Sequence, residues 1–237
     1  MNQAAAKSNK ILGALSDPEW HQLHTDIRLV RVPQREVVHA PLQPIMLVYF
    51  PLDCVLSMIT VMENGDAVES GVVGCEGFSA PQLALGARVP ESEMICQVPG
   101  RAVVMRADSF RTYLDTMPGF RDLVTAYLET LFNAMGQQIA CNRLHTLTQR
   151  CARWLLATHD RVGSDSFQLT HEFLAIMLGV ARTAVTAATG VLQQEGLITS
   201  ARGVITIVDR ARLEDAACEC YGIITKGLNL AKPAKVS

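Results

Sequence analysis

The hydrophobic positions of the first hundred residues alternate over short runs that turn residues separate. Segments such as "IRLVRVP", "IMLVYFP" and "VLSMITVMENGDAVESGVVG" end at proline or contain Asn-Gly, at intervals of roughly ten residues. This rhythm is typical of a compact antiparallel β structure. The clearest hairpin is "VMENGDAVESG", where Asn64-Gly65 supplies the positive φ that a tight turn requires.

From Asp108 onwards the apolar spacing changes to three and four, which is typical of helices. After Pro118 a long helix is predicted from about Gly119 to Arg143. Its apolar surface is broad, so we predict two partners: its own β domain and the same helix of a second subunit. The alternative is a helix buried within one domain. The stripe assigned to the dimer interface consists of Val124, Tyr127, Leu131, Ala134 and Gln138, and Leu123, Leu128, Phe132, Met135 and Ile139 widen it.

The stretch "LTHEFLAIMLGVARTAVTAATGVLQQEGLITSARGVITIVD" has the pattern of two helices and a hairpin. Thr170 is suited to cap the first helix, Gly179 to form a sharp left-handed turn, and Gly196 to end the second helix. Two strands joined at "SARG" follow. Together these elements predict a winged helix-turn-helix, and the alternative is a helical hairpin that binds no DNA.

The second helix of this pair, Arg182 to Glu195, carries one positive charge. Small side chains let such a helix enter the major groove, where Thr and Ala reach thymine methyl groups and Arg182 reaches guanine. Phosphate contacts must then come largely from elsewhere. The outward residues of this helix are Arg182, Thr183, Thr186, Ala187 and Gly190. The candidates for phosphate contacts are Thr170, His171 and Arg202. Arg143 and Arg150 could also contact phosphates, but they can equally be ordinary solvent-exposed charges.

Charge and length refine this picture. Residues 1–140 carry 10 Lys and Arg against 15 Asp and Glu, a net charge of −5, whereas residues 141–237 carry 11 against 8, a net charge of +3. Opposite signs are expected if only the second part meets DNA phosphates. A length of 237 residues favours two domains and a connector. Without a signal peptide or a long apolar run, we expect a cytoplasmic protein with no membrane partner.

The seven cysteines, at positions 54, 75, 96, 141, 151, 218 and 220, include no CxxC pair. Neither a disulfide framework nor a zinc finger is predicted. Cys218 and Cys220, if placed on one helix, would diverge by about 200°, which argues against a shared metal ion. We therefore predict no metal site, and the absence of a catalytic constellation argues against an enzyme.

Over nearly its full length the chain resembles the Crp/Fnr family of bacterial transcription regulators. The segments "VYFPLDCVLSMITVMENGDAVESGVVGCEGF", "CNRLHTLTQRCARWLL", "LTHEFLAIMLGVARTAVTAATGVLQQEGLI" and "AACECYGII" carry the resemblance. It implies an α+β fold with a jelly-roll-like antiparallel β-roll sensor domain over 1–117, similar to cyclic-nucleotide-binding domains. A dimerisation helix over 118–144, a winged helix-turn-helix domain over 145–224 and a disordered tail over 225–237 would follow.

The resemblance also implies a homodimeric, sequence-specific regulator whose partners are double-stranded DNA and RNA polymerase. Arg182 would be the first base-reading residue and Thr170 a phosphate contact. Thr183 and Ala187 stand where the best-known members have Glu and Arg. A different operator from the usual one is therefore expected.

The sequence gives a weaker indication of which effector the sensor domain binds. Cyclic-nucleotide-binding members have a Gly-Glu pair and then an Arg, followed by Ser or Thr, that holds the cyclic phosphate. Here Cys75 separates Gly74 from Glu76, and Arg88 precedes Val-Pro. Because a buried phosphate without a cation is costly, a cyclic nucleotide is not expected at Gly74, Glu76 and Arg88, although a small-molecule effector stays open.

Other cofactors are not expected either. The first cysteine, Cys54, is far from the N-terminal position of the family's iron-sulfur ligands. His21, His24 and His39 invite a haem hypothesis, but we interpret them as surface or turn histidines.

Two alternatives to a DNA-binding regulator of this type stay open. The N-terminal domain can be a small-molecule receptor that acts mainly through protein contacts, with weak DNA binding. Redox sensing by Cys75, Cys96 or Cys151 is the other, and it predicts that oxidant alters DNA affinity.

Overall fold

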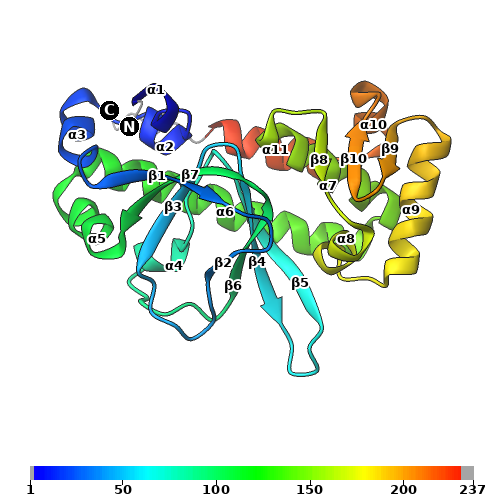
Figure 1. Cartoon of the computed structure of the whole chain (residues 1–237), viewed down its shortest axis with the longest axis horizontal. Helices are drawn as coiled ribbons and strands as arrows, with labels where there is room; N and C mark the ends of the chain where they lie inside the picture. The colour runs from blue at the N-terminus through cyan, green and yellow to red at the C-terminus, as the bar shows by residue number, and fades with distance from the viewer. Residues whose placement is uncertain (1–2, 231–237) are drawn as a thin grey trace. The chain divides into compact units, whose positions relative to one another are not determined.

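The computed structural model describes residues 3–230 and divides the chain into two compact units. The first contains the chain up to Met58, Val72–Phe132 and the residues from Leu228. The second contains Ile59–Gly71 and Asn133–Gly227. The sequence placed residues 59–71 in the sensor domain. In the structure this end of a β-hairpin groups instead with the C-terminal part of the chain. Figure 1 shows the elements in chain order by colour.

The first unit is built on antiparallel strands, as the alternating pattern predicts. One sheet has the order β1-β7-β3, with Ile27 opposite Met105 and Leu47 opposite Arg106. A second sheet has the order β2-β6-β4-β5. The strands are β1 (Ile27–Val32), β2 (Val37–His39), β3 (Leu47–Pro51), β4 (Val55–Val61), β5 (Ala67–Val73), β6 (Glu93–Val98) and β7 (Gly100–Arg106). Gly65, with φ 87°, forms the predicted turn between β4 and β5.

Three short helices precede these strands in the sequence, one lies between β5 and β6, and one follows β7. They are α1 (Gln3–Ala6), α2 (Lys10–Gly13), α3 (Asp17–Leu23), α4 (Pro81–Ala84) and α5 (Ala107–Thr116). The core contains Phe78 and Phe110, whose ring centroids lie 5.2 Å apart, and Phe120, whose ring lies edge-on to Phe110 at 5.5 Å. All three rings are fully buried, so they join the loop after β5, helix α5 and the helix that follows it into one core.

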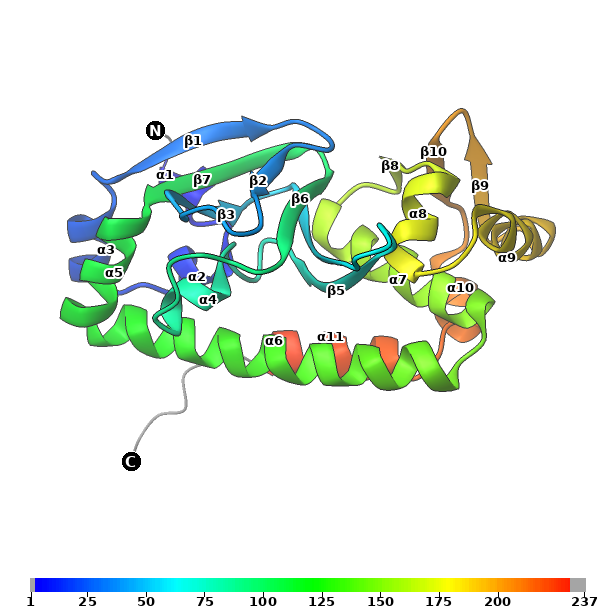
Figure 2. The same ribbon diagram turned by 90° about the horizontal axis from the view of Figure 1, so that it is seen from below.

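The long helix α6 (Pro118–Leu144) runs unbroken over 27 residues (Figure 2). The stripe predicted to form the dimer interface does not face outward. Tyr127 packs on Phe78, with ring centroids 5.3 Å apart, and Gln138 donates to the carbonyl of Glu69 at 2.8 Å. Val124, Tyr127, Leu131 and Gln138 are buried within the chain and Ala134 is half-buried.

That assignment is therefore wrong, because helical spacing reveals the width of an apolar surface but not which side meets which partner. The exposed side of α6 carries Phe132, which is 79% exposed, and Ile139, which is 72% exposed. Leu128, before Phe132, and Met135, between Phe132 and Ile139, are half-buried and continue the same face at spacings of four and three. These four residues, here called the outer stripe, were predicted only to widen the interface.

The second unit contains the end of the β4–β5 hairpin and the C-terminal elements. These are α7 (Leu147–Val162), β8 (Ser166–Gln168), α8 (His171–Leu178), α9 (Arg182–Gln194), β9 (Ile198–Ala201), β10 (Val204–Ile207), α10 (Arg210–Ala216) and α11 (Cys220–Leu230). The three strands pair antiparallel in the order β8-β10-β9. No single helix of the described chain is long and apolar enough to cross a membrane; only α8 and α9 together, bent by 105°, pass on length and composition.

Helix α11 departs from the predicted disorder after residue 224. It continues through residues 225–230, and residues 231–237 of that predicted tail lie outside the described part. Its first turn is held to the rest of the second unit, because Cys220 is buried and the Tyr221 hydroxyl donates to Asp160 Oδ2 at 2.9 Å.

Candidate nucleic-acid interface

Two helices and a turn form the predicted helix-turn-helix. Thr170 caps α8, its Oγ1 accepting from the Phe173 N–H at 3.2 Å. Gly179 ends α8 in the left-handed region, with φ 62° and ψ 44°, where only glycine avoids a steric cost. The 105° bend between α8 and α9 falls in the range of DNA-binding helix pairs. The inner face of α9 is buried, as predicted, through Val185, Ala188 and Leu192.

The opposite face of α9 is open. Arg182, Thr183, Thr186 and Ala187 are exposed, and Gly190 is half-buried. The helix begins after Ala181 without a side-chain cap. Free N–H groups and the positive end of the helix dipole therefore lie beside Arg182, which favours an anionic or hydrogen-bond-accepting ligand.

His171 joins three elements of the domain. Its Nδ1 lies 3.1 Å from Thr186 Oγ1 on α9, and its Nε2 lies 3.2 Å from Ser200 Oγ on β9 and 3.4 Å from Thr189 Oγ1. The side chain is half-buried. This arrangement makes His171 a residue that fixes α9 against the β9–β10 hairpin, rather than the free phosphate contact that the sequence suggested.

The β9–β10 hairpin, the wing, turns at Arg202 and Gly203. Their φ values are 51° and 75°, and Ala201 and Val204 pair across the turn. Two consecutive positive φ angles are the geometry of a tight hairpin turn. Gly203 adopts this conformation without strain, whereas Arg202 adopts it at an energetic cost. Gly203 accepts from the Leu169 N–H at 2.8 Å, so exposed Arg202 is held close to Thr170 and the start of α8.

Arg150 is removed from the phosphate candidates by its burial. It is 9% exposed, and one Nη2 hydrogen donates to the Leu178 carbonyl at the end of α8. It therefore stabilises the helix pair from within. Arg143 is exposed on α6.

The residues assigned to an effector do not form a phosphate site. Glu76 is buried and accepts from the Gly74 N–H at 3.1 Å, so its carboxylate is engaged by its own turn. Arg88 is exposed, and its carbonyl accepts from Ile45. No described contact brings Arg88 to Glu76.

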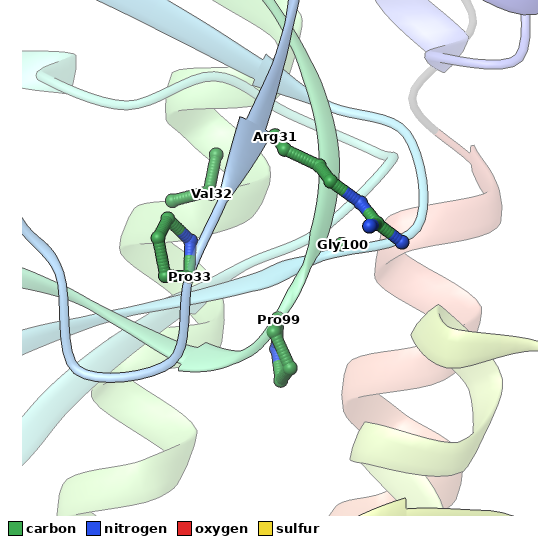
Figure 3. A pocket seen from close by; sticks show the side chains of 5 residues that line it. All are labelled: Arg31, Val32, Pro33, Pro99 and Gly100. Carbon is green, nitrogen blue, oxygen red and sulfur yellow. The ribbon is translucent and has the colours of Figure 1, made fainter.

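Three open cavities of the first unit have volumes of about 360, 430 and 340 Å³, and none is lined by the predicted effector residues. Figure 3 shows the one lined by Arg31, Val32 and Pro33, at the end of β1, and by Pro99 and Gly100, at the start of β7. Arg31 is the one cation among its lining residues.

His39 is not a surface histidine. It is 6% exposed, and its Nε2 lies 2.8 Å from Ser79 Oγ. Burial lowers its pKa to about 4, because the charged imidazolium loses water. His21 and His24 are exposed, as predicted.

Two of the three proposed redox cysteines are poorly placed for that role. Burial raises the pKa of Cys96 and of Cys151 to about 12, so little thiolate exists at neutral pH. Cys75 is only half-buried.

The argument against metal ligation by Cys218 and Cys220 is wrong in its premise. The two residues do not share a helix, because α10 ends at Ala216 and α11 begins at Cys220. Cys218 and Cys220 converge instead on Cys141 and His145. The signal in the sequence was "CNRLH", in which a Cys and a His lie four residues apart at a helix end.

Comparison with known proteins agrees with this architecture. The profile of the Crp-like helix-turn-helix domain matches residues 149–216. No protein with a curated description matches the sequence significantly. A candidate transcriptional regulator of the Crp/Fnr family from Eubacterium rectale has a similar structure, with a TM-score of 0.67, 18% identity, and coverage of 88% of this chain and 98% of that one.

Two further solved structures are similar. FixK2 from Bradyrhizobium japonicum has a TM-score of 0.66 at 12% identity, covering 81% of this chain and 98% of its own. CLP from Xanthomonas campestris, described as a c-di-GMP-responsive global regulator, has a TM-score of 0.65 at 14% identity, covering 81% and 99%. At these identities the likeness establishes the fold.

Proposed function

We propose that this chain, which has the fold of the Crp/Fnr transcription regulators and a Crp-like helix-turn-helix domain, is a homodimeric regulator that binds a specific DNA sequence. The observation that carries the proposal is the face of α9. It is exposed, built from small side chains, uncapped at its start and set at 105° to a buried supporting helix.

This face reads bases mainly by shape and by one cation. Arg182 donates to the O6 and N7 acceptors of a guanine, while the methyl groups of Thr183, Thr186 and Ala187 contact thymine methyls. The Thr186 hydroxyl already donates to the Arg182 carbonyl, at 3.1 Å, so its methyl group is the more available part. The expected half-site is therefore short, with one dominant guanine.

Phosphate contacts come from the edge where the wing meets α8. The exposed hydroxyl of Thr170, the start of α8 and the guanidinium of Arg202 all lie there. His171 positions α9 and the wing relative to each other. With so few cations per subunit, useful affinity requires two subunits on one site.

The outer stripe of α6 supplies the dimer interface in this proposal. Phe132 and Ile139 would be costly to leave in water on so regular a helix, and pairing two copies of the stripe buries them. A twofold dimer places two reading helices in successive major grooves, about 34 Å apart.

A binding selection from random duplex DNA, followed by gel shifts on the enriched site, tests this function. Because a dimer carries Arg182 in both reading helices, Arg182→Ala should weaken binding to the selected site by roughly 5- to 150-fold per half-site, the loss expected for one bidentate base contact, and relax the preference at one position of each half-site. Arg212→Ala is the matched control, since Arg212 is an exposed arginine on α10. Equal affinity of the Arg182 variant and the parent would refute the assigned reading helix. Absence of any salt-dependent DNA affinity would favour the receptor that acts through protein contacts.

A further inference from the structure

Four side chains from three separate segments meet inside the second unit. They are Cys141, His145, Cys218 and Cys220, and one ligand atom from each lies within 4.8 Å of all the others. The three cysteines are buried, between 0% and 4% exposed, and His145 is half-buried. None of them belongs to the DNA-reading surface described above.

The backbone explains why they converge. Cys141 lies in the last turn of α6, and His145 is four residues further, its N–H donating to the Cys141 carbonyl at 3.1 Å. Both side chains therefore leave the same face of a helical turn. On the other side, Ala217 is extended and Cys218 lies in the link between α10 and α11. Cys220 then opens α11, so the two cysteines approach the first pair from different directions.

The separations suit a tetrahedral ion. Cys141 Sγ lies 3.4 Å from Cys218 Sγ, and Cys220 Sγ lies 3.6 Å from His145 Nδ1. Tetrahedral zinc with Zn–S bonds of about 2.3 Å and Zn–N bonds of about 2.0 Å holds its ligand atoms roughly 3.5 to 3.8 Å apart. Small side-chain movements are thus enough to enclose the ion.

The surroundings match those of a metal-thiolate centre. The Nε2 of His145 lies 3.1 Å from Glu219 Oε2, which leaves Nδ1 directed to the cysteines in the carboxylate-histidine-metal arrangement. The amide of Gln137 donates to Cys220 Sγ at 3.1 Å. Arg153 is 5% exposed, interacts electrostatically with Cys141, and its Nε has no hydrogen-bond partner among the described residues. Three thiolates around a divalent ion leave one negative charge, and a buried guanidinium offsets it.

We propose that Cys141, Cys218, Cys220 and His145 Nδ1 form a closed, four-coordinate Zn²⁺ site. Binding forms three Zn–S bonds and one Zn–N bond, and the three thiol protons pass to solvent. Because the protein supplies all four ligands, no position is open for a substrate and the ion is structural. It fastens the end of α6 to the link between α10 and α11. The proposal does not depend on DNA binding.

The test uses the full-length protein, reduced, treated with chelator and titrated with Co²⁺ and then Zn²⁺. We expect one equivalent of Co²⁺ per chain with thiolate charge-transfer and strong tetrahedral absorption bands, both displaced by one equivalent of Zn²⁺. Zn²⁺ should also raise the Tm of the parent protein, since it binds the folded state. Octahedral cobalt bands, binding of less than half an equivalent, or a Cys141–Cys218 disulfide in protein purified with zinc would overturn the site.

Matched variants assign the ligands. Cys141→Ser and Cys220→Ser should lose the tetrahedral spectrum and the zinc-dependent rise in Tm, and His145→Ala should weaken Zn²⁺ binding at least tenfold. Cys54→Ser, which alters a buried cysteine outside the cluster, should keep both signals. Unchanged stoichiometry in Cys141→Ser, or equal loss in Cys54→Ser, contradicts the assignment. If a ligand variant does not fold, the cobalt spectrum of the parent decides alone.

Discussion

The indole Nε1 of Trp154 donates to the Glu69 carboxylate at 3.2 Å, although 85 residues separate them in the chain. Glu69 lies on β5, near the end of the β4–β5 hairpin, and is 2% exposed; Trp154 lies on α7 and is also buried. The Glu69 carbonyl accepts from Gln138 on α6 as well. Three elements are therefore joined at one buried residue, Trp154 through the Glu69 carboxylate and Gln138 through its backbone carbonyl.

Trp154→Phe should destabilise the second unit by about 1 to 3 kcal/mol, because it removes a donor from a buried charge. Urea unfolding of the variant, of Glu69→Gln and of the double variant gives the coupling energy, expected between about 0.5 and 3 kcal/mol. Glu63→Gln, an exposed carboxylate on the same hairpin, is the control and should be neutral. A coupling energy near zero would show that the contact contributes nothing.

The outer stripe of α6 predicts the oligomeric state. Phe132→Asp and Ile139→Asp should each convert a dimer to a monomer in sedimentation equilibrium, since a charge buried without a partner is costly. Leu85→Asp, at a residue 75% exposed outside α6, should leave the dimer intact. A dimer that survives both α6 substitutions would place the interface elsewhere.

Because His171 positions α9 and the wing, its loss should change the affinity for DNA but not the number of phosphates contacted. His171→Ala should weaken specific DNA binding, because α9 and the wing lose their link through Thr186 and Ser200. The slope of affinity against salt concentration should stay that of the parent, whereas Arg202→Asn, which keeps a residue tolerant of positive φ, should lower it by about one phosphate per subunit. Gel shifts at several salt concentrations measure both slopes. A reduced slope in His171→Ala would make His171 a phosphate contact after all.

Local chemistry made much of the fold predictable. Gly179, Gly65 and Thr170 each satisfy a conformational demand within a few residues, so the turn, the hairpin and the cap were correctly predicted. The antiparallel strands and the inner face of α9 followed from periodicity for the same reason.

The predictions that were wrong concern contacts between residues distant in sequence. Periodicity gave α6 a broad apolar surface, but only the burial of Tyr127 against Phe78 shows which side is internal. The burial of Arg150 and the meeting of Cys141 with Cys218 likewise need the tertiary structure. The cysteine cluster was missed because Cys218 and Cys220 were assumed to lie on one helix.

His39 predicts a pH dependence in the first unit. Its pKa is lowered to about 4 from 6.5 by burial, so the unfolded chain takes up a proton below pH 6.5 and the folded chain does not until about pH 4. The contribution of neutral His39 to the free energy of unfolding is therefore fully present above pH 6.5. It is lost as the pH falls from 6.5 to about 4, by roughly 3 kcal/mol in total. Ring-proton NMR titration of His39 and urea unfolding between pH 7.5 and 4.5 measure the pKa and the slope.

Two substitutions separate the causes of this shift. His39→Gln should remove the histidine's share of the pH slope, because the amide does not titrate. Ser79→Ala removes the hydroxyl that lies 2.8 Å from His39 Nε2 but keeps the side chain buried, so the slope should persist. Since burial rather than the hydroxyl excludes the imidazolium, an NMR pKa near 6.5 in the parent protein, or its return to that value in Ser79→Ala, would contradict this account.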